Sequence, residues 1–189
     1  MTTLTLYAES APSQALLRTR DGAAITQHLN QLGVRFERWP IRPLPEGADA
    51  ATVLATYAPE VRQLQQERGY LSVDVAGITP DHPERAAMRQ KFIEEHTHAD
   101  DEVRFFVQGQ GAFYLHLGDR VHQVVCEAGD LISVPAGTRH WFDMGPSPRF
   151  TAIRLFRSPD GWVGHFTGDP LSAAVPRLEA DGEVPAHAA

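Results

Sequence analysis

The sequence predicts a mainly β protein, an antiparallel sandwich or barrel with two or three helices packed outside it. From Phe92 onward, short runs rich in β-branched and aromatic residues alternate with turns that contain glycine. Short strands at regular spacing are typical of such architectures. Before Phe92, apolar residues recur at helical spacing, mostly within residues 20–90. We therefore expect a single domain over residues 1–168, with its helical part at 20–90 and its barrel motifs at 92–157.

Two helices are expected in the first part of the chain. Residues 22–32 carry apolar side chains on one face, and residues 49–68 carry a longer apolar stripe. A glycine follows each stripe and is a typical stop signal for a helix. Because proline cannot continue the hydrogen bonding of a helix, Pro59 predicts a break or kink near Ala58.

Alternation of apolar and polar residues predicts the strands. Residues 3–7 are expected to form an edge strand, and residues 34–39 a half-buried strand that ends at Pro40. Gly109 and Gly111 predict a turn between two of the barrel strands. The expected barrel strands are residues 103–107, 112–117, 121–126, 131–134, 141–142 and 150–156.

The end of the chain has a weaker apolar pattern. After Gly168, a few apolar residues stand among alanine, proline and acidic residues. Terminal segments that are not tied down are commonly poorly ordered. We therefore expect residues 169–189 to be a loosely attached or disordered tail.

Length, charge and hydropathy exclude several classes of protein. The chain has 189 residues, which is enough for one domain with a sizeable core. Its net charge of −7, without a basic stripe, argues against nucleic-acid binding. No apolar run is long enough for a transmembrane helix, and no basic region followed by an apolar stretch marks a signal peptide.

Cysteine usage fits a reducing compartment. Cys126 is the single cysteine, so it cannot form an intramolecular disulfide. We expect it to be a buried small hydrophobic residue, and we expect the protein to be cytoplasmic.

Four side chains in two short segments are candidate metal ligands, namely His96, His98, Glu102 and His140. On a β-strand, side chains two residues apart share a face, so His96 and His98 can converge on one ion. Glu102 can return to the same side after a turn. Three imidazoles and one carboxylate suit a divalent transition metal. If the ion is octahedral, as Fe(II) or Ni(II) often is, open positions remain at which a substrate can bind.

The spacing of these residues resembles the two sequence motifs of the cupin superfamily. The motifs here are His96-x-His98-x-x-x-Glu102 with Gly109 after six further residues, and Gly129 with Pro135-x-Gly137-x-x-His140 after five residues. Two motifs that match in both type and spacing are a stronger signal than one. The resemblance implies an antiparallel, jelly-roll-like cupin β-barrel with the metal ligands lining its inside.

Within the cupins, the chain is most similar to the bacterial acireductone dioxygenases of the methionine salvage pathway. The most specific stretch is Glu95-His96-x-His98-x-x-Asp101-Glu102-Val103-Arg104. The resemblance implies one Fe(II) or Ni(II) ion per chain, held by His96, His98, Glu102 and His140. Members of the family cleave 1,2-dihydroxy-3-keto-5-methylthiopentene, an acireductone, with O2. Their Fe(II) form gives formate and 2-keto-4-methylthiobutyrate, and their Ni(II) form gives formate, carbon monoxide and 3-methylthiopropionate.

The resemblance also implies which partners to expect. They are the acireductone and O2, and the family is commonly monomeric in bacteria. The charge and the hydropathy described above add the expectation of no nucleic-acid and no membrane partner.

Arg104 is the candidate catalytic residue outside the ligand set. It lies two residues after Glu102, so on an extended strand it faces the same side, where its guanidinium can hold an anionic substrate oxygen. A surface arginine on a strand is the alternative.

Aromatic residues are candidates for an apolar wall around the methylthio tail of the substrate. The candidates for the substrate pocket are Phe92, Phe105, Phe142, Trp162 and Phe166, with Arg154 as a polar candidate. Aromatic residues at alternating strand positions more often belong to a plain core, so we expect only one or two of them to contact substrate.

Four polar residues near the motifs are expected to lie away from the ion. Glu95 and Arg139 each precede a proposed ligand histidine, so on a strand they face the opposite side from it. Glu95 is either a partner of the ligands or a solvated carboxylate. His116 and His122 lack ligand spacing and are predicted to be outward-facing strand residues.

Two other functions remain open at this point. One is a different cupin enzyme with the same ligand set, such as another dioxygenase, a decarboxylase or a sugar-phosphate isomerase. The other is a cupin that binds a metal or small molecule without catalysis. Uptake of O2 that depends on an acireductone would distinguish an acireductone dioxygenase from both of these alternatives.

Overall fold

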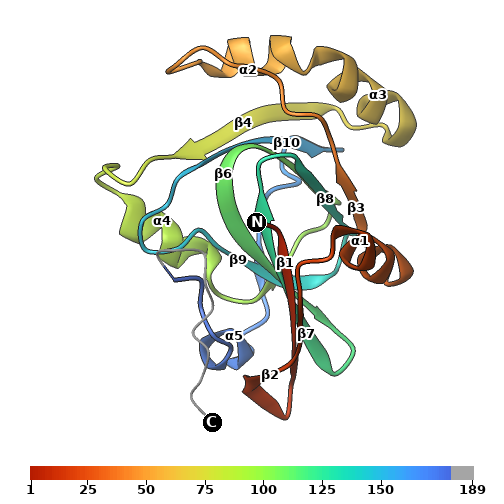
Figure 1. Cartoon of the computed structure of the whole chain (residues 1–189), viewed down its shortest axis with the longest axis vertical. Helices are drawn as coiled ribbons and strands as arrows, with labels where there is room; N and C mark the ends of the chain where they lie inside the picture. Colours follow the sequence, from red (N-terminus) through yellow and green to blue (C-terminus); the bar gives the residue numbers. More distant parts are fainter. Residues whose placement is uncertain (180–189) are drawn as a thin grey trace.

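The computed structural model describes residues 1–179 of the chain. Within this part, eleven strands hydrogen-bond into one antiparallel sheet that curls into a barrel (Figure 1). The predicted fold class is confirmed, because the protein is mainly antiparallel β with a few helices outside the barrel. No helix of the described residues is both long enough and apolar enough to cross a membrane.

The elements follow one another along the chain, and their bounds are these. The strands are β1 (Thr3–Ala8), β2 (Ala11–Thr19), β3 (Arg35–Arg38), β4 (Ser72–Ile78), β5 (His96–Thr97), β6 (Glu102–Leu117), β7 (Arg120–Glu127), β8 (Asp130–Val134), β9 (Arg139–Asp143), β10 (Phe150–Phe156) and β11 (His165–Phe166). The helices are α1 (Gly22–Gln31), α2 (Ala50–Thr56), α3 (Ala58–Arg68), α4 (Arg85–Phe92) and α5 (Leu171–Ala174).

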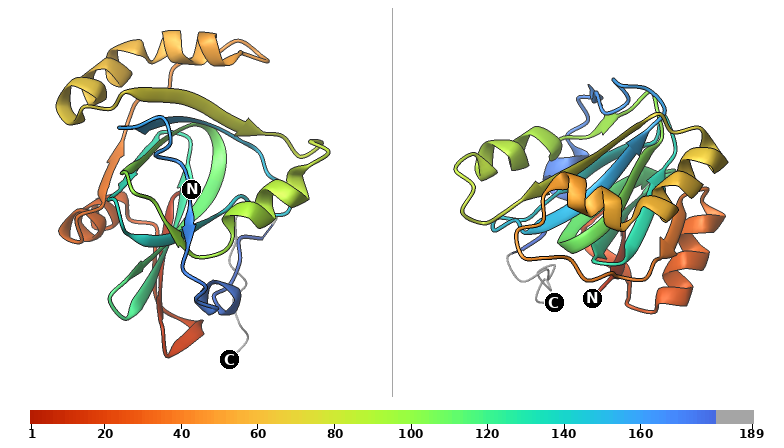
Figure 2. Two further views of the ribbon diagram at one scale, coloured as in Figure 1. Left: turned by 180° about the vertical axis from the view of Figure 1, so that it is seen from behind. Right: turned by 90° about the horizontal axis from the view of Figure 1, so that it is seen from above.

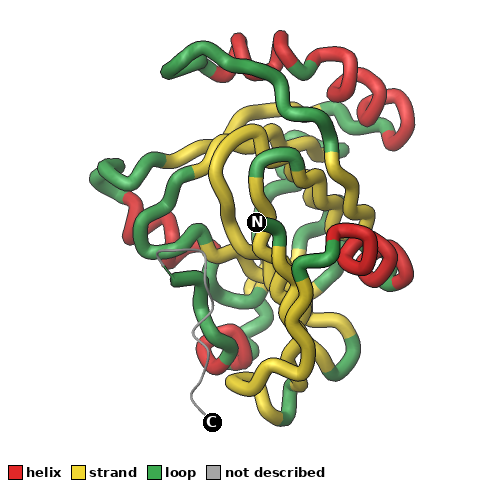
Figure 3. The backbone as a smooth tube through the Cα atoms, viewed as in Figure 1, coloured by secondary structure: helices red, strands yellow, loops and turns green. Residues whose placement is uncertain are grey.

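The helices lie around the outside of the barrel (Figure 3). α2 and α3 cross over β4, α1 packs beside β3, and α4 and α5 lie near β9 and β2 (Figures 1 and 2). The longer predicted helical stripe is divided in two at Tyr57, with Pro59 in the first turn of α3. The predicted break near Ala58 is confirmed.

β6 is the central strand of the barrel. Its sixteen residues pair with β7, β8, β9 and β10. The prediction of two strands separated by a turn at Gly109 and Gly111 is wrong. Gly109 has a φ of +69°, and a Cβ there would lie 1.8 Å from the carbonyl oxygen of Arg149. The glycine therefore lets the strand bend against a neighbouring backbone, and it does not end the strand.

Two further predictions about the first half differ from the structure. β1 is not an edge strand, because it lies between β7 and β2. The edge is β2, which the sequence did not reveal because most of its side chains are exposed and show no buried face. Residues 20–90 are also less helical than expected, since they include β4 as well as β3.

The start of the predicted tail is packed against the barrel. Leu171, Val175 and Leu178 are buried in one cluster with Tyr114 and Trp141. The expectation of a loosely attached tail is therefore wrong for residues 169–179. The rest of that prediction, residues 180–189, lies outside the described residues.

The alternation of β6 separates the inside of the barrel from its outer layer. Phe106, Phe113 and Leu115 belong to the large apolar cluster in the barrel, which also contains Cys126, buried as predicted. Val103 and Phe105 belong to a second cluster that lies under α2 and α3. Glu102 has the same parity as Phe106, so β6 directs it to the inside of the barrel.

Candidate metal centre

Three of the four predicted ligands lie on the strands β5, β6 and β9, and the fourth directly follows β5. His96 opens β5, Glu102 opens β6, and His140 is the second residue of β9. His96 pairs directly with His140 across β5 and β9, and His98 follows two residues after His96. All four side chains are buried.

The three imidazoles point the same nitrogen toward a common centre. Their candidate ligand nitrogens lie within 4.8 Å of one another. Each Nδ1 contacts a backbone carbonyl, at 2.7 Å for His96 and Glu94, 2.9 Å for His98 and Val163, and 2.7 Å for His140 and Thr138. A carbonyl oxygen only accepts, so each Nδ1 carries a proton and donates it to that carbonyl. Each Nε2 is then the nitrogen that can bind an ion once it carries no proton of its own.

Glu102 completes the set with a negative charge. Its Oε2 lies 3.1 Å from Nε2 of His140 and 3.4 Å from Nε2 of His98. Burial opposes ionisation, but the positive charge of Arg104 and the hydrogen bonds with the two histidines outweigh it and hold the pKa of Glu102 well below its usual range. The carboxylate is therefore ionised at neutral pH.

The protonation of His96 also suits a ligand. Burial, together with the neighbouring His140, lowers the pKa of His96 to about 4, so this ring is neutral at neutral pH. A neutral imidazole and an ionised carboxylate are the forms that bind metals. The three nitrogens, within 4.8 Å of one another, need only a small approach to share one ion, since zinc–nitrogen bonds, for example, are about 2.0–2.1 Å long. The donor set therefore fits a divalent transition metal.

Arg104 is buried beside the centre, which excludes the surface alternative. It is 7% exposed, and its Nη2 lies 2.5 Å from Oε1 of Glu102. Its guanidinium also lies over the rings of Phe113 and Phe142, 4.9 Å and 4.2 Å from their centroids. Its Nε has no hydrogen-bond partner among the described residues. This buried donor is available to a ligand.

A cavity of about 530 Å³ reaches Arg104. Four of the predicted pocket residues line it, namely Phe92, Phe142, Arg154 and Trp162. Arg154 lies opposite Arg104 across β6 and β10, and Asp74 binds it through both carboxylate oxygens, at 2.8 Å and 2.6 Å. The cavity therefore offers one unpaired arginine donor within aromatic walls.

Two predicted aromatic residues do not line this cavity. Phe105 is wrong as a pocket residue, because it lies one residue from Arg104 and so faces the outer layer. There it packs against Trp39 and Tyr57, with ring centroids 5.0 Å away in both cases. Phe166 is 57% exposed, and its ring centroid lies 5.7 Å from that of His96.

Comparison with known proteins decides the family. The family model described as ARD/ARD' matches residues 4–164. The chain belongs to the acireductone dioxygenase family. The resemblance noted in the sequence is thereby confirmed, and so is the expectation that the chain is an enzyme.

The relatives match nearly the whole chain. An acireductone dioxygenase from Parvibaculum lavamentivorans is 58% identical over 96% of this chain and 99% of its own length. One from Hahella chejuensis is 53% identical over 95% and 97%. A solved acireductone dioxygenase from Bacillus anthracis, with a cadmium ion in its active centre, is 31% identical and superposes with a TM-score of 0.77 over 88% of this chain and 98% of that one.

The acireductone dioxygenase family is metal-dependent, and in this chain the cluster of His96, His98 and His140 can hold a metal ion.

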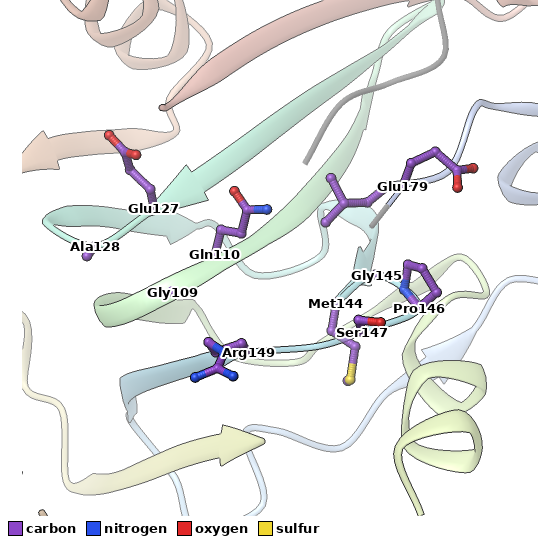
Figure 4. A pocket seen from close by; sticks show the side chains of 11 residues that line it. Gly109, Gln110, Glu127, Ala128, Met144, Gly145, Pro146, Ser147, Arg149 and Glu179 are labelled. Carbon is purple, nitrogen blue, oxygen red and sulfur yellow. The ribbon is translucent and has the colours of Figure 1, made fainter. Parts of the chain in front are cut away.

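A second cavity, of about 410 Å³, is not lined by the predicted metal ligands (Figure 4). Gln110, Glu127, Arg149 and Glu179 are among its lining residues, and none of the predicted site residues is.

Sequence reasoning missed the surroundings of three basic residues. Lys91 lies 5.5 Å from the rings of both Phe92 and Trp162 and adds a cation to the cavity wall. His116 and His122 were predicted to face outward, and both are buried. His116 contacts Glu95 and His122 contacts His28, partners that are distant in the chain and that no local pattern could reveal.

Proposed function

We propose that this chain cleaves 1,2-dihydroxy-3-keto-5-methylthiopentene with O2, at one Fe(II) or Ni(II) ion held by His96, His98, Glu102 and His140. With Fe(II) the products are formate and 2-keto-4-methylthiobutyrate, and the reaction serves methionine salvage. With Ni(II) the products are formate, carbon monoxide and 3-methylthiopropionate. The observation that carries the proposal is the convergence of three Nε2 atoms and one ionised carboxylate beside a cationic, aromatic cavity.

The ligand set leaves room for chemistry at the centre. A bound divalent ion supplies Lewis acidity and a template that orients an oxygen-donor substrate. The chain provides three imidazoles and a single carboxylate, which compensates only half of the charge of a divalent ion. An anionic substrate is therefore attracted to the site. All four donors come from one chain, so the site needs no second copy.

Arg104 orients the anionic end of the substrate in this proposal. One side of its guanidinium holds Oε1 of Glu102, and its Nε has no partner in the described protein. The rings of Phe113 and Phe142 cover the guanidinium and keep water from it. A donor in such an environment binds an oxygen anion more strongly than it would in water.

The aromatic walls of the cavity suit the other end of the substrate. Phe92, Phe142 and Trp162 surround the space next to Arg104, and Met88 and Phe150 add apolar surface. A thioether packs favourably against aromatic rings. The methylthio tail is accordingly placed here, with the two hydroxyl-bearing carbons toward the histidines.

Oxygen uptake by reconstituted protein tests this function. We expect metal-free protein loaded with Fe(II) to consume O2 only when acireductone is present. His98→Ala removes one ligand and should abolish this uptake, whereas His82→Ala, at a partly exposed histidine far from the ligands in sequence, should retain it. If the unsubstituted protein, loaded with metal, takes up no O2 with acireductone, the proposed function is wrong and another cupin activity is indicated.

A further inference from the structure

A polar cluster, formed by two buried residues and one partly exposed arginine, lies on the reverse side of the strands that carry the ligand histidines. Glu95 precedes His96, and Arg139 precedes His140, so both face away from the centre. His116 on β6 pairs with Arg139 across β9, while Leu115 pairs with His140. The three side chains therefore meet behind the proposed ligands.

The contacts of this cluster satisfy its buried groups. Nδ1 of His116 lies 2.6 Å from Oε2 of Glu95, and both side chains are fully buried. The other oxygen of Glu95 accepts a hydrogen bond of 2.8 Å from the hydroxyl of Thr167. Nη2 of Arg139 lies 3.2 Å from Nε2 of His116. The buried pair of Glu95 and His116 is therefore fully hydrogen-bonded, and a satisfied buried network of this kind is rigid.

The cluster adds side-chain bonds between two short strands and the barrel. β5 has two residues and pairs with β9 through the single bridge between His96 and His140. β11 also has two residues, and it leads from Val163, whose carbonyl orients His98, to Thr167. Glu95 is bound both to β6 through His116 and to the end of β11 through Thr167. The cluster thus fixes β5 and β11 onto the barrel.

The same cluster holds the carbonyls that orient two of the histidines. Nδ1 of His96 donates to the carbonyl of Glu94, whose peptide group continues into Glu95. Nδ1 of His140 donates to the carbonyl of Thr138, whose peptide group continues into Arg139. Anchoring Glu95 and Arg139 therefore sets the direction of those carbonyls and, through them, of the two rings.

We propose that Glu95, His116 and Arg139 are positioning residues that set the orientation of His96 and His140 and thereby the metal affinity of the centre. The inference rests on the proposed metal site. Asp169 joins Glu95 and His116 in a group whose ligand atoms lie within 4.8 Å of one another, so a second metal ion is the competing explanation. The guanidinium of Arg139 already occupies the position of a cation, 3.2 Å from His116 and 3.9 Å from Asp169.

Two substitutions of His116 distinguish a role of its hydrogen bonds in positioning the ligands from a role of its ring in packing alone. His116→Asn keeps a donor near the place of Nδ1 and retains the hydrogen bond to Glu95, whereas His116→Phe keeps a ring without any donor. His122→Asn is the matched control, because His122 is an equally buried histidine that pairs with His28 and contacts none of the cluster. Circular dichroism of the metal-free chains verifies that each is folded.

The readouts are Ni(II) affinity, by competition with a chromophoric chelator, and the visible spectrum of the Co(II) form. We expect His116→Phe to weaken Ni(II) binding about 10–100-fold, the range typical of groups that support metal ligands. Its Co(II) spectrum should change. His116→Asn should recover most of the affinity, and His122→Asn should bind as the parent does.

Several outcomes overturn the inference. Parental affinity in His116→Phe, equal losses in His116→Asn and His116→Phe, or an equal loss in His122→Asn would each do so. Two Ni(II) ions per parent chain, with one lost in His116→Phe, would establish the second metal site instead. If His116→Phe does not fold, Thr167→Val is used in its place, because it removes the hydrogen bond to Oε1 of Glu95. Unchanged Ni(II) affinity in Thr167→Val would also overturn the inference. A parent that binds no Ni(II) contradicts the proposed function itself.

Discussion

At the scale of single residues, the alternation of side chains along β6 decides which of them face the metal centre. Glu102 and Arg104 are two apart and both face the centre, while Phe105 between two inward-facing residues lies in the outer layer. Sequence parity was sufficient to predict the first two positions. The same alternation puts Phe105 on the opposite face, so its aromatic character alone does not indicate a pocket residue.

Arg104 provides the first prediction at this scale. Arg104→Gln keeps a donor for Glu102 but removes the charge and the free Nε. A hydrogen bond to a charged group contributes about 1.5–3 kcal/mol, so kcat/KM should fall roughly 10–150-fold at unchanged metal content. Steady-state kinetics on protein with measured metal content checks this. Arg62→Gln, at an exposed position on α3, is the control. Normal turnover in fully loaded Arg104→Gln would remove Arg104 from the mechanism.

His122 provides the second prediction, for acid stability. Burial, together with His28 and Arg120, lowers its pKa from 6.5 to about 4. Between these values the unfolded chain takes up a proton that the folded chain refuses, so stability is lost as pH falls from 6.5 to 4. His122→Asn removes this loss, which we expect to be about 1–3 kcal/mol.

Urea unfolding of the metal-free chains across this pH range measures the effect. As the pH falls, the free energy of unfolding of the parent should decrease relative to that of His122→Asn. His82→Asn, at a partly exposed histidine, is the control substitution. A constant difference for His122→Asn would show that His122 does not oppose protonation in the folded chain.

At the scale of elements, glycine has two different roles that the sequence alone does not separate. Gly118 makes the turn between β6 and β7, with φ of +64° and open space at its Cβ position. Gly109 has nearly the same φ but lies inside β6 against the backbone of Arg149. Both look like turn glycines in the sequence, so the sequence predicts two strands where the structure has the single strand β6.

This difference gives a matched pair of substitutions. Gly118→Ala should cost roughly 1 kcal/mol of stability, because it introduces only the strain of a positive φ. Gly109→Ala adds a clash with a carbonyl oxygen and should cost at least about 3 kcal/mol more. Denaturant unfolding of both variants measures the two costs. Equal costs would mean that β6 does not approach Arg149 as described.

The elements that sequence reasoning missed share a physical cause. β2 exposes most of its side chains, so it has no apolar alternation to detect. The segment from Leu171 to Leu178 has only three buried apolar residues, yet each packs against side chains such as Trp141 from distant strands. Patterns within one segment predicted the helices α1, α2 and α3 well. Burial that depends on partners elsewhere in the chain leaves no such pattern.

At the scale of the whole molecule, β6 contributes to all three apolar clusters. Because one strand connects the barrel interior with both outer layers, we propose that residues 20–90 and the barrel unfold together as one domain. The metal centre joins β5, β6 and β9, so its occupancy should stabilise this whole unit.

Metal binding should therefore raise the thermal stability of the entire chain. At a free metal concentration 100 times the dissociation constant, the free energy of unfolding rises by about 2.7 kcal/mol. For a chain of this size that corresponds to roughly 5–11 °C in Tm. Scanning calorimetry should show a single transition that moves with Ni(II), and His98→Ala should abolish the shift. An equal shift in His98→Ala would place the stabilising ion elsewhere.

The most direct test of the central claim uses one batch of metal-free protein, divided and loaded anaerobically with either Fe(II) or Ni(II). Acireductone and O2 are then added, and the products are identified. We predict formate and 2-keto-4-methylthiobutyrate from the Fe(II) form, and formate, carbon monoxide and 3-methylthiopropionate from the Ni(II) form. Identical products from both forms would contradict the claim that the bound ion selects the reaction, and no products from either loaded form would contradict the proposed activity.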